Sequence, residues 1–189
     1  RSETVPSAAV RNVPTEVAAS FPDQGGSGDV TIPHTFGWGI GWVEDTWNVE
    51  FATQLTLWDS FQALTINFDE GLPSPSTTEP RNWEVAPMFR LGGEVRFGDL
   101  ATRLGVVYDV SPVPDETVEP GLPDGNRFNV SAGLGYTFGA FTIDAAYLAV
   151  ILEGRSLDDT IIPSPDTPFE GRFEGGVVHV IATSVGVDF

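Results

Sequence analysis

The amino-acid sequence predicts an all-β fold, an antiparallel β-barrel that spans a membrane. Alternation of apolar and polar residues with a period of two dominates the chain, and helical periodicity is nearly absent. Short connections alternate with long ones, and aromatic residues gather near both ends of the predicted strands. These three features are typical of barrels in the bacterial outer membrane.

Seven long strands are expected, and most have the ten or so residues that a tilted strand needs to cross a bilayer. In the second strand the apolar residues have odd numbers up to Leu57 and even numbers from Leu64 onward. Because such a change of parity turns side chains to the opposite face, we expect a bulge within residues 58–61. The expected strands are residues 34–43, 47–68, 82–97, 100–109, 128–138, 141–152 and 176–189.

Each predicted strand has one apolar face, and the charged residues lie on the other face. In the first strand Phe36, Trp38 and Ile40 share one face, whereas glycines occupy the opposite one. The charged residues inside the strands are Glu50, Glu84, Arg90, Glu94, Arg96, Arg103, Asp144 and Asp188, all on the face opposite to the apolar residues.

Alternation alone does not decide which face points inward, because a secreted β-sandwich would bury the apolar face. The connections favour the barrel: 44–46, 98–99 and 139–140 are tight, whereas 70–81, 110–127 and 153–175 are long, which places all long loops at one end. The aromatic residues also form two belts, which a sandwich does not require. They are Trp42, Trp47, Phe97, Phe138, Phe141 and Phe189 at the short-turn end, and Phe68, Trp83, Tyr108 and Phe128 at the long-loop end.

Composition excludes several classes of protein. The 189 residues are 41% hydrophobic, which argues against general disorder, and cysteine is absent, which excludes disulfides and thiolate metal sites. The net charge is -18, and all nine basic residues are arginine. Nucleic acid is therefore not an expected partner, because its binding requires clustered positive charge. The chain contains no run of about 18 apolar residues, so no transmembrane helix is predicted.

The segment 108–115 has the sequence Tyr-Asp-Val-Ser-Pro-Val-Pro-Asp and is followed by Leu-Pro-Asp-Gly-Asn-Arg at 122–127. Together with the segments 58–64, 90–94 and 131–136, it resembles the FadL family of outer-membrane long-chain fatty-acid transporters, which has aromatic-hydrocarbon relatives of the toluene-porin type. The resemblance covers nearly the whole chain, and Arg1-Ser2-Glu3 is similar to the end of a preceding family strand.

The resemblance implies a fourteen-stranded barrel, of which this chain supplies the last seven strands and a preceding loop. We therefore expect the C-terminal half of such a transporter, without its N-terminal hatch and signal peptide. Residues 1–33 are expected to form an extracellular loop and lead-in, and residues 34–189 the transmembrane strands with their long extracellular loops. The alternative is a small closed barrel, to which residues 15–21 and 29–33 could add extended structure.

For function, the resemblance implies passive transport of hydrophobic molecules, long-chain fatty acids or hydrocarbons, across the bacterial outer membrane. The expected partners are hydrophobic small molecules, outer-membrane lipids, lipopolysaccharide and the barrel assembly machinery. That machinery reads a terminal aromatic signal, for which Phe189 is the candidate. A structural or binding barrel, or a secreted sandwich, without transport activity is the alternative.

Arginine suits a fatty-acid carboxylate because its planar fork can donate two hydrogen bonds. The candidate ligand-binding residues are Arg81, Arg90 and Arg103, and Arg96 shares their face. Arg81 is chosen because, in the family, a basic residue near that strand start helps to hold the carboxylate. In the alternative interpretation these arginines pair with Glu84, Glu94, Asp144 or Asp188 and only neutralise buried charge.

No catalytic residue, cofactor or metal is expected. The two histidines, His34 and His179, share the apolar face of their strands, and no nucleophile motif or paired-carboxylate motif is present. The acidic loops lack the spacing of a calcium-binding loop, and solvation accounts for their charge.

Overall fold

The computed structural model describes residues 2–8, 24–68, 76–158, 160–161, 163–164, 167–168 and 170–188. Phe189, the predicted assembly signal, and the predicted extended segment 15–21 lie outside the described residues. The described part consists of antiparallel sheets with two short 3₁₀ turns, which confirms the all-β prediction. Within it, no helix is long and apolar enough to cross a membrane.

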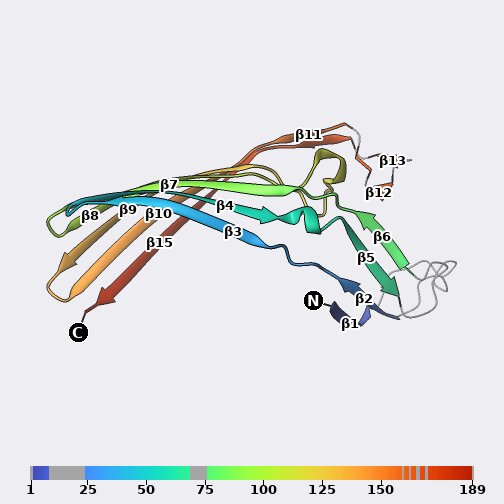
Figure 1. The fold of residues 1–189 in the computed structure, drawn as a ribbon, viewed down its shortest axis with the longest axis horizontal. Helices are drawn as coiled ribbons and strands as arrows, with labels where there is room; N and C mark the ends of the chain where they lie inside the picture. Colours follow the sequence, from blue (N-terminus) through green and yellow to red (C-terminus); the bar gives the residue numbers. More distant parts are fainter. Residues whose placement is uncertain are drawn as a thin grey trace.

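Seven strands form the main sheet, in the order β15-β10-β9-β8-β7-β4-β3 (Figure 1). Of these seven strands, those that are consecutive along the chain are also neighbours in the sheet. The sheet is therefore an antiparallel meander, as the alternation predicts. The strands are β3 (Thr35–Val43), β4 (Trp47–Leu57), β7 (Val85–Phe97), β8 (Leu100–Asp109), β9 (Arg127–Phe138), β10 (Phe141–Leu152) and β15 (Gly176–Val187).

The three predicted tight turns are present and lie at one end of the sheet (Figure 1). Two of them begin with a glycine of positive φ, Gly98 at 61° and Gly139 at 59°. A two-residue hairpin turn requires this left-handed conformation, and glycine adopts it without steric cost. The turns therefore fix the register of the β7–β8 and β9–β10 hairpins.

The predicted second strand, 47–68, is interrupted rather than continuous. β4 ends at Leu57, a 3₁₀ turn η2 (Trp58–Ser60) follows, and β5 (Ala63–Phe68) leaves the main sheet. The predicted irregularity is thus confirmed, but it turns the chain into a second sheet instead of forming a bulge. The third strand begins at Val85 and not at 82, because residues 81–84 contain Asn82 with φ 49°.

A second sheet of four strands, in the order β1-β2-β5-β6, lies beyond the long-loop end of the main sheet (Figure 1). It consists of β1 (Ser2–Ala8), β2 (Gln24–Asp29), β5 and β6 (Ser76–Pro80). β1 includes Ser2 and Glu3, which were compared above with the end of a preceding family strand. β2 was not expected, and β6 falls within the predicted loop 70–81. The loop 153–175 contains β11 (Arg155–Leu157), β12 (Pro163–Ser164), β13 (Thr167–Pro168) and β14 (Gly171–Phe173), and the loop 110–127 contains η3 (Asp115–Thr117).

The main sheet has an apolar face and a polar face, and the apolar face is exposed. Phe36, Trp38, Ile40 and Trp42 retain 62%, 62%, 69% and 63% of their accessible surface. In the described residues no second layer covers this face, so the sandwich alternative does not hold. The edge strands β3 and β15 each pair on one side only among the described strands, so the sheet does not close into a small barrel.

Buried apolar residues gather instead at the long-loop end. Val113, Val118 and Leu157 form a small core against Trp83 and Phe173, which shows that the long loops pack on one another. Two members of the predicted aromatic belt at this end lie elsewhere: Trp83 belongs to this core, and Phe68 lies in the second sheet, opposite Gly26. At the short-turn end two members of the predicted belt, Phe138 and Phe141, stack with ring centroids 5.7 Å apart, and Tyr136 stacks on Phe138 at 6.4 Å.

Candidate ligand-binding site

A cavity of about 460 Å³ lies at the long-loop end of the polar face. Its floor is the sheet, through Thr56 of β4 and Ala86 and Met88 of β7, and its roof is the loop that follows β8. Ligand pockets in proteins have this size and are mainly apolar with a few polar groups. The lining residues are Thr56, Trp58, Trp83, Ala86, Met88, Asp109, Val110, Ser111, Pro112, Val113, Leu122, Pro123, Asp124, Gly125 and Arg127.

The roof is the Ser-Pro-Val-Pro segment, and short hydrogen bonds hold it over the polar face. The hydroxyl of Ser111 donates to Asp124 Oδ2 at 2.8 Å and accepts from the backbone N–H of Val113 at 3.2 Å. The N–H of Glu84 donates to the carbonyl of Pro112 at 2.8 Å, which ties the loop to the start of β7. Because two prolines restrict the backbone of this loop, little entropy is lost in ordering it.

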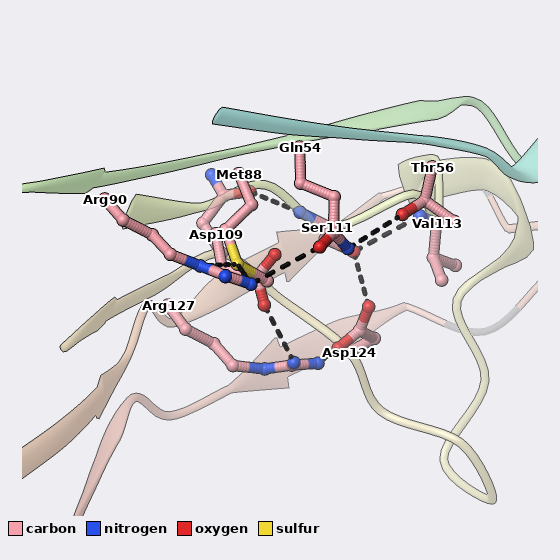
Figure 2. A network of polar contacts seen from close by, with 10 residues as sticks. Gln54, Thr56, Met88, Arg90, Asp109, Ser111, Val113, Asp124 and Arg127 are labelled. Carbon is pink, nitrogen blue, oxygen red and sulfur yellow. Dashed lines mark hydrogen bonds and ion pairs between the residues drawn. The ribbon is translucent and has the colours of Figure 1, made fainter. Parts of the chain in front are cut away.

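Arg127, the first residue of β9, joins two acids of the cavity. Its guanidinium donates to Asp109 Oδ2 at 3.2 Å and also to Asp124 Oδ1 (Figure 2). Arg155 in turn donates to the backbone oxygen of Asp124 at 3.0 Å and to Asp115 at 2.6 Å. Arginines therefore bind acids of the long loops, so these loops are ordered by ion pairs rather than simply solvated.

Three aromatic side chains lie near the end of β4 and the start of β7. Trp83 lies with its ring centroid 4.8 Å from that of Trp58 and 5.0 Å from that of Phe61, both edge to face. Gln62 spans the break, because its amide donates to the carbonyls of Asp59 at 2.8 Å and Trp83 at 3.0 Å. The cluster forms an apolar wall of the cavity through Trp58 and Trp83.

Arg90 differs from the other arginines in the described residues, because it forms no ion pair with a carboxylate there. Its guanidinium lies against Met88 Sδ at 3.0 Å and Gln54 Oε1 at 3.4 Å, next to the cavity (Figure 2). Thioether sulfur and amide oxygen are weak or neutral acceptors. Asp109 is near enough to interact with the charge of Arg90 but forms no salt bridge with it, so the hydrogen-bond donors of Arg90 can still turn to an anionic ligand.

Arg103 and Arg96 form the network that the alternative interpretation predicts. Arg103 donates to Glu94 Oε2 at 2.6 Å and to Asp144 Oδ1 at 2.7 Å, and Arg96 donates to Glu94 Oε1 at 2.6 Å. This chain of charges crosses the polar face from β7 to β10, toward the short-turn end. A ligand role for Arg103 stays a prediction, and it would require the displacement of one of these carboxylates.

Arg81 is 6% exposed and bonds to two carboxylates, Glu79 and Glu119, each at 2.7 Å. Its backbone oxygen accepts the hydroxyl of Thr117 at 2.6 Å, so Arg81 connects β6 with the loop after β8. It does not line the cavity. A ligand role for Arg81 also stays a prediction, because a ligand carboxylate would have to replace Glu79 or Glu119.

The histidines lie away from the cavity. His179 lies on the apolar face of β15, where its Nδ1 is 2.6 Å from the hydroxyl of Tyr147, and His34 precedes β3. Glu84, expected inside a strand, lies just before β7. In the described part of the chain no group of three or more histidine, aspartate or glutamate residues could hold a metal ion.

Sequence reasoning did not single out Met88, Trp58 or Arg127 as site residues. The available signal was the Ser-Pro-Val-Pro segment, because a proline-fixed loop that follows a strand can fold back over the sheet. The aromatic character of Trp58 next to the predicted irregularity was a second signal.

The fold is that of a β-sheet protein whose apolar face is exposed, and the cavity is a candidate binding site for a mainly apolar molecule. The family model described as "Outer membrane protein transport protein (OMPP1/FadL/TodX)" matches residues 4–189, and the chain belongs to this family. Membership places the protein in the bacterial outer membrane and identifies its sheet as part of a transmembrane barrel.

Individual relatives agree with this family. The chain is 29% identical over 131 residues to a long-chain fatty acid transport protein of Salmonella typhi, which is 67% of this chain and 29% of that protein. It is 30% identical over 101 residues to the long-chain fatty acid transport protein of Escherichia coli K12, which is 53% of this chain and 22% of that protein. The chain thus spans less than a third of the length of these relatives.

A solved structure shows the same fold. The crystal structure of a Pseudomonas aeruginosa FadL homologue superimposes with a TM-score of 0.76 at 26% identity. The match covers 88% of this chain and 38% of that structure, so the sheet described here corresponds to one part of it.

Proposed function

We propose that this protein carries hydrophobic molecules, long-chain fatty acids or hydrocarbons, across the bacterial outer membrane without an energy source. Family membership supports transport of hydrophobic compounds, and the relatives named above are long-chain fatty acid transport proteins. In this proposal residues 34–189 are the transmembrane part, with the long loops outside the cell, and residues 1–33 form an extracellular lead-in. Contacts with lipopolysaccharide and with the barrel assembly machinery remain predictions.

The apolar face contacts lipid in this arrangement, and the polar face lines the interior. Exposed Trp, Phe and Ile side chains on one face of a single sheet have a large hydrophobic driving force to leave water. The cavity on the polar face is then the first site that a molecule meets when it enters from outside. Trp58, Trp83 and Met88 receive its apolar part.

The observation that carries this proposal is the combination of an apolar cavity with an arginine whose hydrogen bonds go to neutral acceptors. A fatty-acid carboxylate beside Asp109 and Asp124 is repelled unless a cation is available, and Arg127 is already bound to both acids. Arg90 is the available cation. A fatty acid would bind with its tail in the cavity and its carboxylate at Arg90, whereas a neutral hydrocarbon would use the cavity alone.

The test is the uptake of labelled oleate and labelled toluene by bacteria that lack their own fatty-acid transporter and produce this protein. Arg90→Ala should lower oleate uptake at least threefold and leave toluene uptake unchanged. Arg96→Ala is the matched control, since it removes one charge from the same strand and face, and its uptake of oleate should equal that of the parent. Absence of uptake of both compounds by the parent would contradict the proposed function, and equal oleate uptake by the Arg90 variant would contradict the carboxylate site alone.

A further inference from the structure

Arg81 joins the end of β6 to the loop 110–126 that covers the cavity, which we call the roof loop. Its guanidinium donates to Glu119 Oε1 of the roof loop through Nη1 and to Glu79 Oε2 of β6 through Nη2, each at 2.7 Å. The side chain is buried, so its charge depends on these two carboxylates. The ion pair with Glu119 therefore fastens the roof loop to the segment between β6 and β7.

Further hydrogen bonds hold the same part of the roof loop. The hydroxyl of Thr117 donates to the backbone oxygen of Arg81 at 2.6 Å, and the amide of Asn82 donates to Glu116 Oε1 at 2.8 Å. Thr117 and Val118 keep only 1% and 0% of their accessible surface. Residues 116–119 are therefore the anchored part of the roof loop, and Arg81 supplies the positive charge of the anchor.

The anchored part leads directly to residues that line the cavity. Glu119 and Leu122 form an antiparallel bridge, and the N–H of Leu122 donates to the carbonyl of Glu119 at 3.1 Å. The three residues that follow this turn in the chain order, Leu122, Pro123 and Asp124, line the cavity. Because the turn is tied to Glu119, the position of Glu119 determines where these lining residues lie.

Arg81 and Arg90 stand in different relations to the cavity. Arg81 is not a lining residue, and its two terminal nitrogens are bound to acids inside the protein. Arg90 donates to the neutral acceptors Met88 and Gln54 next to the cavity. A ligand carboxylate reaches Arg90 without displacing an acid, whereas at Arg81 it would have to displace one from a buried ion pair.

We propose that Arg81 is a positioning residue: through its ion pair with Glu119 it holds the roof loop over the cavity and so sets the affinity of the cavity for charged and neutral molecules alike. This inference rests on the proposed function. Without Arg81, Glu119 is a partly buried carboxylate that lacks its cation, and it moves toward water to regain solvation. The turn 119–122 moves with it, and the apolar contacts that oleate and toluene share are weakened.

The first test measures uptake of labelled oleate and labelled toluene over a range of concentrations, corrected for the amount of each variant in the outer membrane. Arg81→Gln and Glu119→Gln should each raise the half-saturating concentration of both compounds at least threefold, and the double variant should be no worse than either. Arg81→Lys, which keeps the cation, should recover part of the affinity for both compounds. Glu79→Gln is the matched control, because it removes an acid from Arg81 that belongs to β6 and not to the roof loop, and its uptake should equal that of the parent.

The second test reports on the roof loop without any ligand. The chain contains no cysteine, and Val118 is fully buried beside Glu119, so Val118→Cys should react slowly with a water-soluble maleimide in outer membranes. Addition of Arg81→Gln should accelerate this labelling at least fivefold, because the roof loop is released. Addition of Glu79→Gln should leave the rate unchanged.

A higher half-saturating concentration of oleate in Arg81→Gln, with that of toluene unchanged, would overturn the proposal, because Arg81 would then bind the carboxylate itself. Labelling of position 118 at the same rate with and without Arg81→Gln would also overturn it, since the roof loop would not depend on the ion pair. Uptake of neither compound by the parent would refute the proposed function, and the labelling of position 118 would still decide whether Arg81 holds the roof loop.

Discussion

Single residues on the polar face decide which charged contacts can form. Arg103 reaches Asp144 by passing over β9, where the two residues that it crosses are glycines. A β-carbon at Gly135 would meet Asp144 Oδ1 and would lie 3.1 Å from Arg103 Nη1. Glycine at position 135 therefore leaves the space through which the ion pair forms.

Gly135→Ala should separate Arg103 from Asp144 and lower the free energy of unfolding by about 1 kcal/mol, the upper value for partly exposed ion pairs. Gly133→Ala is the control, because its β-carbon would lie 3.6 Å from Arg103 Cβ in ordinary contact. Urea unfolding in lipid vesicles measures the free energy of unfolding of both glycine variants. In an Asp144→Ala background the two glycine variants should become equally stable, and a loss at Gly135 that persists there would show that the ion pair is not the cause.

At this scale the sequence indicated which arginines share the polar face, and it left open whether they bind a ligand or pair with acids. For Arg103 and Arg96 the pairing is observed. Arg90 has the same place in the alternation, but in the described residues it hydrogen-bonds only to Met88 and Gln54 and forms no salt bridge. Alternation could not distinguish them, because the partner of a long side chain depends on the strands beside it and not on parity.

At the scale of elements, the main feature is the corner at which two neighbouring strands leave the main sheet. β4 gives way to β5 at residues 58–62, and β6 gives way to β7 at residues 81–84. The carbonyl of Gln62 accepts the N–H groups of Arg81 at 2.8 Å and Asn82 at 3.1 Å, and its side chain donates across the same corner. One residue thus supplies hydrogen bonds where the ladder is interrupted.

Gln62→Glu should weaken this corner, because a carboxylate of the same size cannot donate to the carbonyls of Asp59 and Trp83. The expected loss is about 1 kcal/mol in local stability, in the range for removal of hydrogen bonds near the surface. Hydrogen exchange at the amides of Arg81 and Asn82 should accelerate about fivefold, since 1.4 kcal/mol corresponds to a factor of ten. Unchanged exchange at these two amides would show that the backbone contacts alone hold the corner.

Five of the seven main strands agree with the expected boundaries within two residues, because unbroken period-two alternation and tight turns specify them. The continuous strand 47–68 was wrong, although the change of parity near residue 58 marked its interruption. β6 was missed because its residues, Ser-Thr-Thr-Glu-Pro, carry little strand signal. Its pairing with β5 is a tertiary contact that local sequence does not encode.

At the scale of the whole molecule, the two faces of the main sheet differ in chemical character. One face is an exposed apolar surface, and the other carries a cavity and a charged network. The sequence predicted the division into faces and the position of the loops. It could not predict the cavity, because the cavity exists only where the loop 110–126 folds back over β7, between elements far apart in the chain.

The assignment of the two faces is the central claim, since transport and the carboxylate site both depend on it. The most direct test is a cysteine scan of β9 in outer membranes, with the substitutions Asn129→Cys, Ser131→Cys, Val130→Cys and Leu134→Cys. We predict that positions 129 and 131 react with a water-soluble maleimide, whereas positions 130 and 134 resist it and, once labelled with a fluorophore in detergent, are quenched by nitroxide-bearing lipids. Reaction of positions 130 and 134 with the aqueous reagent, together with lipid quenching at 129 and 131, would contradict the account.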